Sequence, residues 1–245
     1  MKSLKKDLSS LLEGVCRLRE NSVRWLGHST FEIITGGGTK ILIDPWITGN
    51  PRCPVEAEDV ADVDIVLITH DHHDHMGDDL ALLAGDEKTD ILVQPEVAAK
   101  IADMGVDGAT GMNIGGTVEI SGIGITMVQA FHSSSAGFPC GFIVTTEDGK
   151  RIYHAGDTGI FSTMQTLGDI YDLDVALLPI GSHFVMDPEQ AAHAVRLLQP
   201  DVVVPMHFGT FPVLVETPDA FLERVAQLAP DAEVRVLEPG DAMKF

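Results

Sequence analysis

The sequence is poor in basic residues. Its 245 residues include 16 lysines and arginines against 37 aspartates and glutamates, which gives a formal net charge of −21. No lysine or arginine occurs from 101 to 149 or from 152 to 195. A protein that binds duplex nucleic acid needs many cations to displace counterions from the phosphates, and an anionic membrane surface repels an acidic chain. The composition therefore argues against polyanionic partners and leaves room for one local anion pocket.

Cysteines and long apolar runs are also scarce. The three cysteines, Cys16, Cys53 and Cys140, are widely spaced and form no Cys-x-x-Cys pair, so neither a disulfide framework nor a thiolate zinc site is indicated. No apolar stretch approaches the roughly 18 residues of a membrane span. The N-terminal apolar run, Leu8 to Leu12, is too short for the core of a signal peptide. These features predict a soluble cytoplasmic protein.

The remaining composition is that of an ordinary globular chain, with 44% hydrophobic and 22% charged residues. Apolar residues recur at helical spacing between 3 and 18, which predicts an amphipathic helix packed on the domain; a subunit contact or a lid is the alternative. No composition break or linker follows. We therefore expect an N-terminal extension at 1–22 and a single domain at 23–245, built from two packed sheets flanked by helices.

Strands and helices alternate through this domain. Strands are predicted at 23–26, 31–35, 40–44, 64–69, 91–93, 117–120, 124–130, 141–146, 150–154, 174–179, 201–205 and 233–237. Helices are predicted at 78–83, 95–104, 188–198 and 218–228. Pro188 and Pro218 suit the first turn of a helix, with Asp187 and Thr217 as the preceding N-caps.

Four histidines fall within six residues directly after the apolar strand at 64–69. The window reads His70-Asp71-His72-His73-Asp74-His75. Residues two apart in an extended segment point the same way, so His70 and His72 can reach one metal ion together, whereas Asp74 and His75 suit a second ion beside it. Imidazole and carboxylate ligands favour Zn²⁺ and related first-row ions. An exposed polar loop or an adventitious metal tract is the alternative for this window.

Three further strand ends carry a candidate ligand, which favours the metal site. His132, Asp157 and His207 each lie at or just after the end of a predicted strand. Histidines of an apolar core would not usually recur at strand ends, whereas the loops that follow strands often hold functional residues. The sequence thus predicts one metal site assembled from the ends of several strands.

These residues together resemble the sequence marks of the metallo-β-lactamase fold superfamily. The marks are Asp44 at the end of an early strand, the His-x-His-x-Asp-His window at 70–75, His132, Asp157 and His207. The segments 25–29, 44–50, 112–116 and 178–184 are similar to the largely uncharacterised metal-dependent hydrolases related to L-ascorbate-6-phosphate lactonase. The resemblance begins near residue 23 and runs to the C-terminus. It implies an α/β (α+β) fold, a four-layer αββα sandwich with the site at one edge between the sheets.

The same resemblance implies two divalent ions as cofactors, with zinc the first choice and manganese the second. The first ion would take His70, His72 and His132, the second would take Asp74, His75 and His207, and Asp157 would bridge them. Asp44 is expected to fix the window by hydrogen bonds rather than to touch metal. A hydroxide held by both ions would attack an ester, lactone or phosphoester of a small metabolite, with Asp74 orienting the hydroxide and carrying its proton.

The other histidines are assigned from their placement. His28 and His183 lie in glycine-containing loops and are candidates for a catalytic proton donor or a substrate contact; a structural loop role is the alternative. His154 is expected to be structural. His73 is expected to face solvent or support the site, and His193 to lie at the surface or in packing.

Three functions stay open at this level. A metal-dependent hydrolase acting on a small molecule is the leading one. A phosphodiesterase or nuclease on the same site is the second, for which Arg52 is either a phosphate handle or a solvated surface residue. A metal-binding regulatory protein without turnover is the third. The expected partner is a small-molecule substrate, without duplex nucleic acid or membrane, and a homo-oligomer is left open.

Overall fold

The computed structural model describes residues 19–85 and 88–245. The amphipathic helix predicted at 3–18 lies outside the described residues. The division of the chain at residue 22 stays a prediction.

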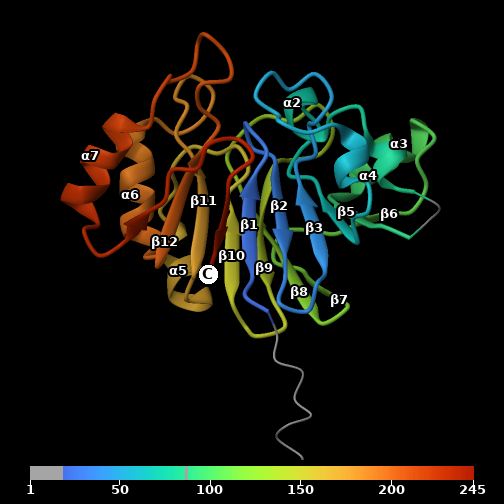
Figure 1. Cartoon of the computed structure of the whole chain (residues 1–245), viewed down its shortest axis with the longest axis horizontal. Helices are drawn as coiled ribbons and strands as arrows, with labels where there is room; N and C mark the ends of the chain where they lie inside the picture. Colours follow the sequence, from blue (N-terminus) through green and yellow to red (C-terminus); the bar gives the residue numbers. More distant parts are fainter. Residues whose placement is uncertain (1–18, 86–87) are drawn as a thin grey trace, which may run out of the picture.

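Two seven-stranded mixed sheets form the centre of the molecule (Figure 1). The first sheet has the order β14 (Ala242–Lys244), β1 (Ser22–Trp25), β2 (Phe31–Ile34), β3 (Lys40–Ile43), β4 (Ile65–Leu67), β5 (Asp90–Val93) and β6 (Ala109–Gly111). The second has the order β13 (Glu233–Val234), β12 (Val202–Met206), β11 (Val175–Pro179), β10 (Arg151–His154), β9 (Cys140–Thr145), β8 (Ile123–Gln129) and β7 (Thr117–Ile120). In both sheets, antiparallel hairpins pass into parallel strands.

Helices flank the two sheets, and Figure 1 shows them gathered at opposite sides of the molecule. Beside the first sheet lie η1 (Ala57–Val60), α2 (His73–Met76), α3 (Leu80–Leu83) and α4 (Pro95–Asp103). Beside the second lie α5 (Met164–Tyr171), α6 (Pro188–Leu198) and α7 (Asp219–Leu228). Helix α6 packs against β11, α5 and α7. The two mixed sheets with flanking helices are the sandwich that the sequence resemblance implied.

Alternation along the parallel strands explains why helices are needed on the outer faces. In β3, Ile41 and Ile43 belong to the core between the sheets, whereas Leu42 belongs to a second core beneath α3 and α4. In β4, Ile65 and Val66 divide in the same way. A strand that is apolar on both faces must be covered on both, and full burial of each such side chain contributes about 1.5–3 kcal/mol.

Several predicted elements need correction. Strands β6 and β14 and helices α2 and α5 were not predicted, and the helix predicted from 78 begins at Leu80. Asp187 is the N-cap of α6 and accepts a hydrogen bond from the Gln190 amide. Thr217 is not the N-cap of α7, because Pro218 occupies that position and the helix begins at Asp219. Thr217 lies one residue before that N-cap, and its hydroxyl donates to the Asp219 carboxylate.

Candidate metal centre

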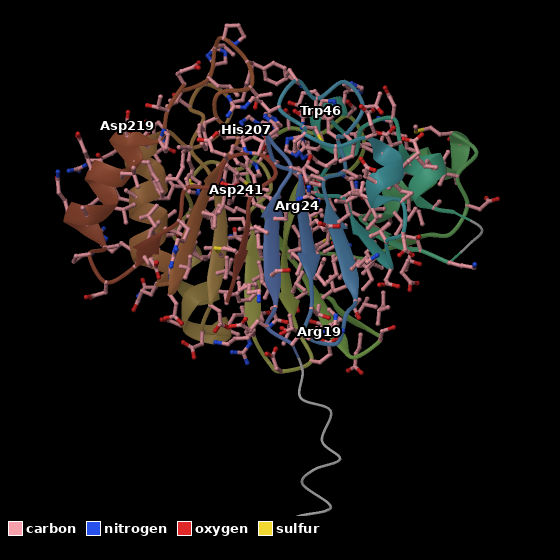
Figure 2. The ribbon with its side chains drawn as sticks, viewed as in Figure 1. Arg19, Arg24, Trp46, His207, Asp219 and Asp241 are labelled. Atoms are coloured by element: carbon pink, nitrogen blue, oxygen red, sulfur yellow. The ribbon has the colours of Figure 1, made fainter. Side chains whose placement is uncertain are left out.

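The predicted metal ligands meet at one edge of the two sheets. His70, His72, Asp74 and His75 follow β4, His132 follows β8, Asp157 follows β10 and His207 follows β12. Figure 2 shows His207 and Trp46 near this edge, where the loops of both sheets gather. The fold therefore brings together all seven residues that sequence reasoning had assigned to metal.

One group of histidines matches the first predicted ion site. Ligand atoms of His70, His72 and His132 lie within 4.8 Å of one another. His70 is fully buried, and its Nε2 lies 3.0 Å from Nδ1 of His72. Burial, together with the neighbouring His75, lowers the pKa of His70 to about 3. The neutral imidazole favoured by this environment is the form that binds a metal ion.

A second group lies beside the first. Ligand atoms of His28, Asp74, His75 and His207 lie within 4.8 Å of one another. Three of these residues were predicted for the second ion; His28 had been expected as a proton donor or a substrate contact. The structure therefore adds one histidine to this group.

Asp157 lies between the two groups. Its Oδ1 is 3.3 Å from Nε2 of His75, and its Oδ2 is 3.0 Å from Nε2 of His207 and 3.5 Å from Nε2 of His132. Burial opposes ionisation of this carboxyl group, but His207 and His75 hold its pKa well below the ordinary value. An ionised carboxylate between two histidine groups is suited to bridge two cations.

Unpartnered buried atoms provide the test of whether a metal fits. Among the described residues, Nε2 of His28, Nε2 of His75 and Oδ1 of Asp157 are buried without a hydrogen-bond partner. Leaving a buried polar atom unpaired costs about 1–3 kcal/mol, and such atoms are rare in folded proteins. All three atoms belong to the groups described above. Divalent cations at this edge would satisfy all three, so the residues fit the cofactor that the sequence implied.

Asp44 supports the histidine window through hydrogen bonds. Its carboxylate accepts hydrogen bonds from the Thr69 amide and the Thr69 hydroxyl, both at 2.8 Å, and from Nδ1 of His75 at 2.7 Å. Because Nδ1 of His75 is engaged in this way, Nε2 is left to face Asp157. Burial raises the pKa of Asp44, but the neighbouring histidines, His75 foremost, together keep the pKa below its ordinary value. The supporting role predicted for Asp44 is confirmed by these contacts.

Asp71 is a supporting residue that sequence reasoning missed. Its carboxylate accepts hydrogen bonds from the Ser134 hydroxyl at 2.7 Å, from the amides of Ser135 at 2.7 Å and Ala136 at 3.0 Å, and from the Lys100 ammonium at 2.7 Å. The loop that carries His132 is thereby fastened to the window. In an extended segment, the alternation that points His70 and His72 the same way points Asp71 to the opposite side. This alternation was the one signal in the sequence that could have indicated the supporting role of Asp71.

Three other histidines stand where the sequence placed them. His154 is fully buried, with Nε2 2.9 Å from the Ser29 carbonyl and Nδ1 accepting the Gly156 amide at 3.1 Å. Its structural role is confirmed. His73 is exposed, and its Nδ1 lies 3.7 Å from Asp78. His193 pairs with Glu189 one turn away on α6, at 3.3 Å, as a surface residue does.

The two catalytic candidates outside the window differ in environment. His28 is fully buried, and its Nε2 lies 3.3 Å from Oδ2 of Asp74. His183 is exposed and places its ring edge-on to Phe184, with ring centroids 4.4 Å apart. No described contact joins His183 to the metal-ligand groups. A catalytic role for either residue stays a prediction.

A cleft opens over the centre. It has a volume of about 280 Å³ and is lined by His72, Asp74, His132, Ser133, Asp157, Phe184 and His207. Arg52, the candidate phosphate handle, does not line it. Its guanidinium lies 3.9 Å from Glu238 and close to Gly209, and its side-chain stem packs against Gly27. The described lining therefore consists of candidate metal ligands, one hydroxyl group and one aromatic ring.

The fold and this centre define a protein of the metallo-β-lactamase superfamily, and residues 39–208 match the family model described as the beta-lactamase superfamily domain. The metallo-β-lactamase fold protein YhfI of Bacillus subtilis superposes with a TM-score of 0.72, covering 93% of this chain and 100% of its own, at 13% identity. At that identity the likeness shows the fold alone.

Closer relatives place the chain within the superfamily. A UPF0173 metal-dependent hydrolase of Lawsonia intracellularis is 45% identical over 231 residues, which is 91% of this chain and 99% of the relative. The structure of Igni18, a metallo hydrolase from Ignicoccus hospitalis, matches with a TM-score of 0.84 and 41% identity, covering 93% of this chain and 99% of that one. The chain belongs to the UPF0173 metal-dependent hydrolase family. None of the helices within 19–85 and 88–245 has both the length and the apolar character that a bilayer span requires.

Proposed function

We propose that the protein hydrolyses a neutral ester or lactone of a small metabolite, with two divalent ions held in the centre described above. The observation that carries the proposal is the joint cluster itself: two groups of ligand atoms, linked by Asp157, at the floor of one cleft. The preference for a neutral substrate rests on the cleft lining, which contains no lysine or arginine among the described residues. A phosphoester would be held there by the ions alone.

The proposed ligand set is the one reached from sequence, with the first ion on His70, His72 and His132 and the second on Asp74, His75 and His207. Asp157 would contact both. When bound, such a pair of ions lowers the pKa of a water molecule between them and polarises the oxygen under attack. Zinc is the first choice and manganese the second, because imidazole and carboxylate ligands accept both.

The protein's own groups would position the substrate and move protons. Asp74 is about one-third exposed, with 29% of its side chain open at the cleft. Burial opposes its ionisation, but the histidines around it, His28 and His75, together hold the pKa of Asp74 below its ordinary value. The ionised carboxylate can accept a proton from the attacking water and return it to the leaving group. Ser133 offers a hydroxyl to the substrate, and Phe184 offers an apolar wall.

The test is turnover by chelator-stripped protein before and after one metal is returned. Substrates are p-nitrophenyl acetate, p-nitrophenyl butyrate and a series of γ-lactones, against bis(p-nitrophenyl) phosphate and single-stranded RNA. We expect ester or lactone turnover that disappears on stripping and returns with Zn²⁺ or Mn²⁺. Cleavage of the phosphodiesters without ester turnover would support a phosphodiesterase or nuclease instead. Absence of any turnover in metal-replete protein would support a metal-binding regulatory protein.

A further inference from the structure

His28 occupies an unusual position for a residue so early in the chain. It lies in the turn between β1 and β2 of the first sheet, whereas His207 follows β12 in the second sheet. The centroids of the two imidazole rings are nevertheless only 3.9 Å apart. The ring is fully buried. Its Nε2 has no hydrogen-bond partner and faces Oδ2 of Asp74 at 3.3 Å.

The backbone holds His28 in place at a conformational cost. Its φ is +54°, and that of His207 is +58°, in the left-handed region that side-chain-bearing residues seldom adopt. The His28 carbonyl accepts the amide of His207 and the indole N–H of Trp25, each at 3.0 Å. The bond from the His207 amide connects the two sheets and brings the two rings side by side. Strain of this kind tends to occur at functional sites.

The hydrogen bonds around Thr210 indicate which ring nitrogen of His28 carries the proton. Nδ1 lies 3.1 Å from the Thr210 hydroxyl, and that hydroxyl donates its own proton to the Phe208 carbonyl at 3.3 Å. With its own proton given to Phe208, Thr210 accepts from Nδ1–H of His28, and in this tautomer Nε2 carries a lone pair. Asp74 also presents a lone pair. Two acceptors that face each other at 3.3 Å repel unless a cation lies between them.

We infer that Nε2 of His28 is an additional ligand of the second metal ion, beside Asp74, His75 and His207. This inference rests on the metal centre of the proposed function and extends it. Together with Asp157, the second site then has five protein ligands against four at the first site. The second site is accordingly expected to bind metal more tightly and to fill first, which leaves the first ion as the more exchangeable one.

The experiment measures metal affinity rather than turnover. Chelator-stripped wild type, His28→Gln and His73→Gln are titrated with Co²⁺ against a chromophoric chelator, and the visible spectrum of the bound cobalt is recorded. His73→Gln is the matched control, because His73 lies in the same window but is exposed and outside both ligand groups. We expect His28→Gln to weaken the tighter of two ions by at least about tenfold and to change its spectrum. The control should bind both ions as wild type does.

Wild-type affinities for both ions and an unchanged spectrum in folded His28→Gln would overturn the inference. If that variant does not fold, a crystal structure of wild type loaded with Zn²⁺ decides the matter, with an expected distance of about 2.0–2.1 Å from Nε2 of His28 to an ion. An ion placed beyond about 3 Å, with Nε2 bonded to Asp74 instead, would also overturn it. His28 bound to metal in a protein without esterase activity would keep this inference and refute the proposed function. Ester turnover with His28 unbound would do the reverse.

Discussion

Replacement of Asp71 by asparagine is expected to loosen the loop that carries His132. The Asp71 side chain is fully buried, and each of its oxygens has two donors. Oδ1 accepts from the Ser134 hydroxyl and the Ser135 amide, and Oδ2 accepts from the Ala136 amide and Lys100. An asparagine retains one oxygen and turns an NH₂ group toward the other pair of donors. One pair therefore loses its acceptor.

The size of the effect follows from those contacts. A hydrogen bond to a charged group contributes about 1.5–3 kcal/mol. The share of Lys100 is smaller than this, because its side chain is 38% exposed and solvent screens the pair. Loss of two such bonds is therefore expected to lower the free energy of unfolding by about 3 kcal/mol. For a chain of this size that corresponds to a fall in Tm of roughly 6–12 °C.

Urea unfolding of the stripped protein, followed by circular dichroism, measures this loss. Asp78→Asn is the matched control, because Asp78 is an exposed carboxylate near the same window, with 70% of its side chain open to solvent. A change within about 0.5 kcal/mol is expected for the control. The affinity for the ion assigned to His132 should also weaken, because its loop is no longer fastened. A loss below about 1 kcal/mol in Asp71→Asn would refute the assignment of these bonds.

The difference in stability between wild type and Asp71→Asn is expected to depend on pH. Burial opposes ionisation of Asp71, but the hydrogen bonds from Lys100 and Ser134 prevail and lower its pKa from 3.8 to about 2. A carboxyl group with a depressed pKa in the folded state stabilises the fold above its unfolded pKa. The stability gap between wild type and Asp71→Asn should therefore be full above pH 4 and narrow as the pH falls from 3.8 toward 2. A gap that stays constant through this window would show that the charge of Asp71 is not the cause.

Three further changes test other parts of the centre. Gly181→Ala should displace His207, because a Cβ at Gly181 would lie 2.0 Å from the His207 carbonyl oxygen. Metal titration should show that the affinity for the second ion falls by at least about tenfold. Unchanged binding would contradict this packing. His72→Ala should lose one ion, measured by elemental analysis, and retention of both ions with full activity would show that the ligand assignment is wrong. Phe184→Ala should raise KM for apolar esters several-fold with little change in kcat. The reason is that loss of about 1 kcal/mol of apolar contact weakens substrate binding about fivefold. Equal KM values would show that Phe184 does not contribute to substrate binding.

Local patterns were sufficient to predict most of the two sheets and the residues that meet at the candidate metal centre. The apolar runs of β3 and β4 are properties of a few adjacent residues, so they are visible in sequence. The histidine window combines two local signals, a strand end and a ligand spacing. Asp187 combines a capping residue with a following proline, and its side chain caps α6 as expected.

The features that were missed depend on partners far away in the chain. Strand β14 is three residues long and exists because it pairs with β1, more than 200 residues earlier. Asp71 finds its donors 63 to 65 residues later in the loop after His132. His28 has its hydroxyl partner 182 residues away. Such pairings follow from the closed sandwich, so the sequence near each residue does not identify its partner.

The metal centre and the closure of the sandwich depend on each other. The histidine window comes from the first sheet, whereas His132, Asp157 and His207 come from the second. The unfolded chain cannot hold these groups together, so ions that bind the folded state alone stabilise it, by about 2.7 kcal/mol when free metal is 100 times Kd. Without ions, buried carboxylates rely on neighbouring imidazoles; the pKa of His75, which burial lowers, is raised well above its ordinary value by Asp157 and Asp44. The acidic composition therefore bears on the site in one limited way: two carboxylates, Asp74 and Asp157, lie in the groups proposed to hold the cations.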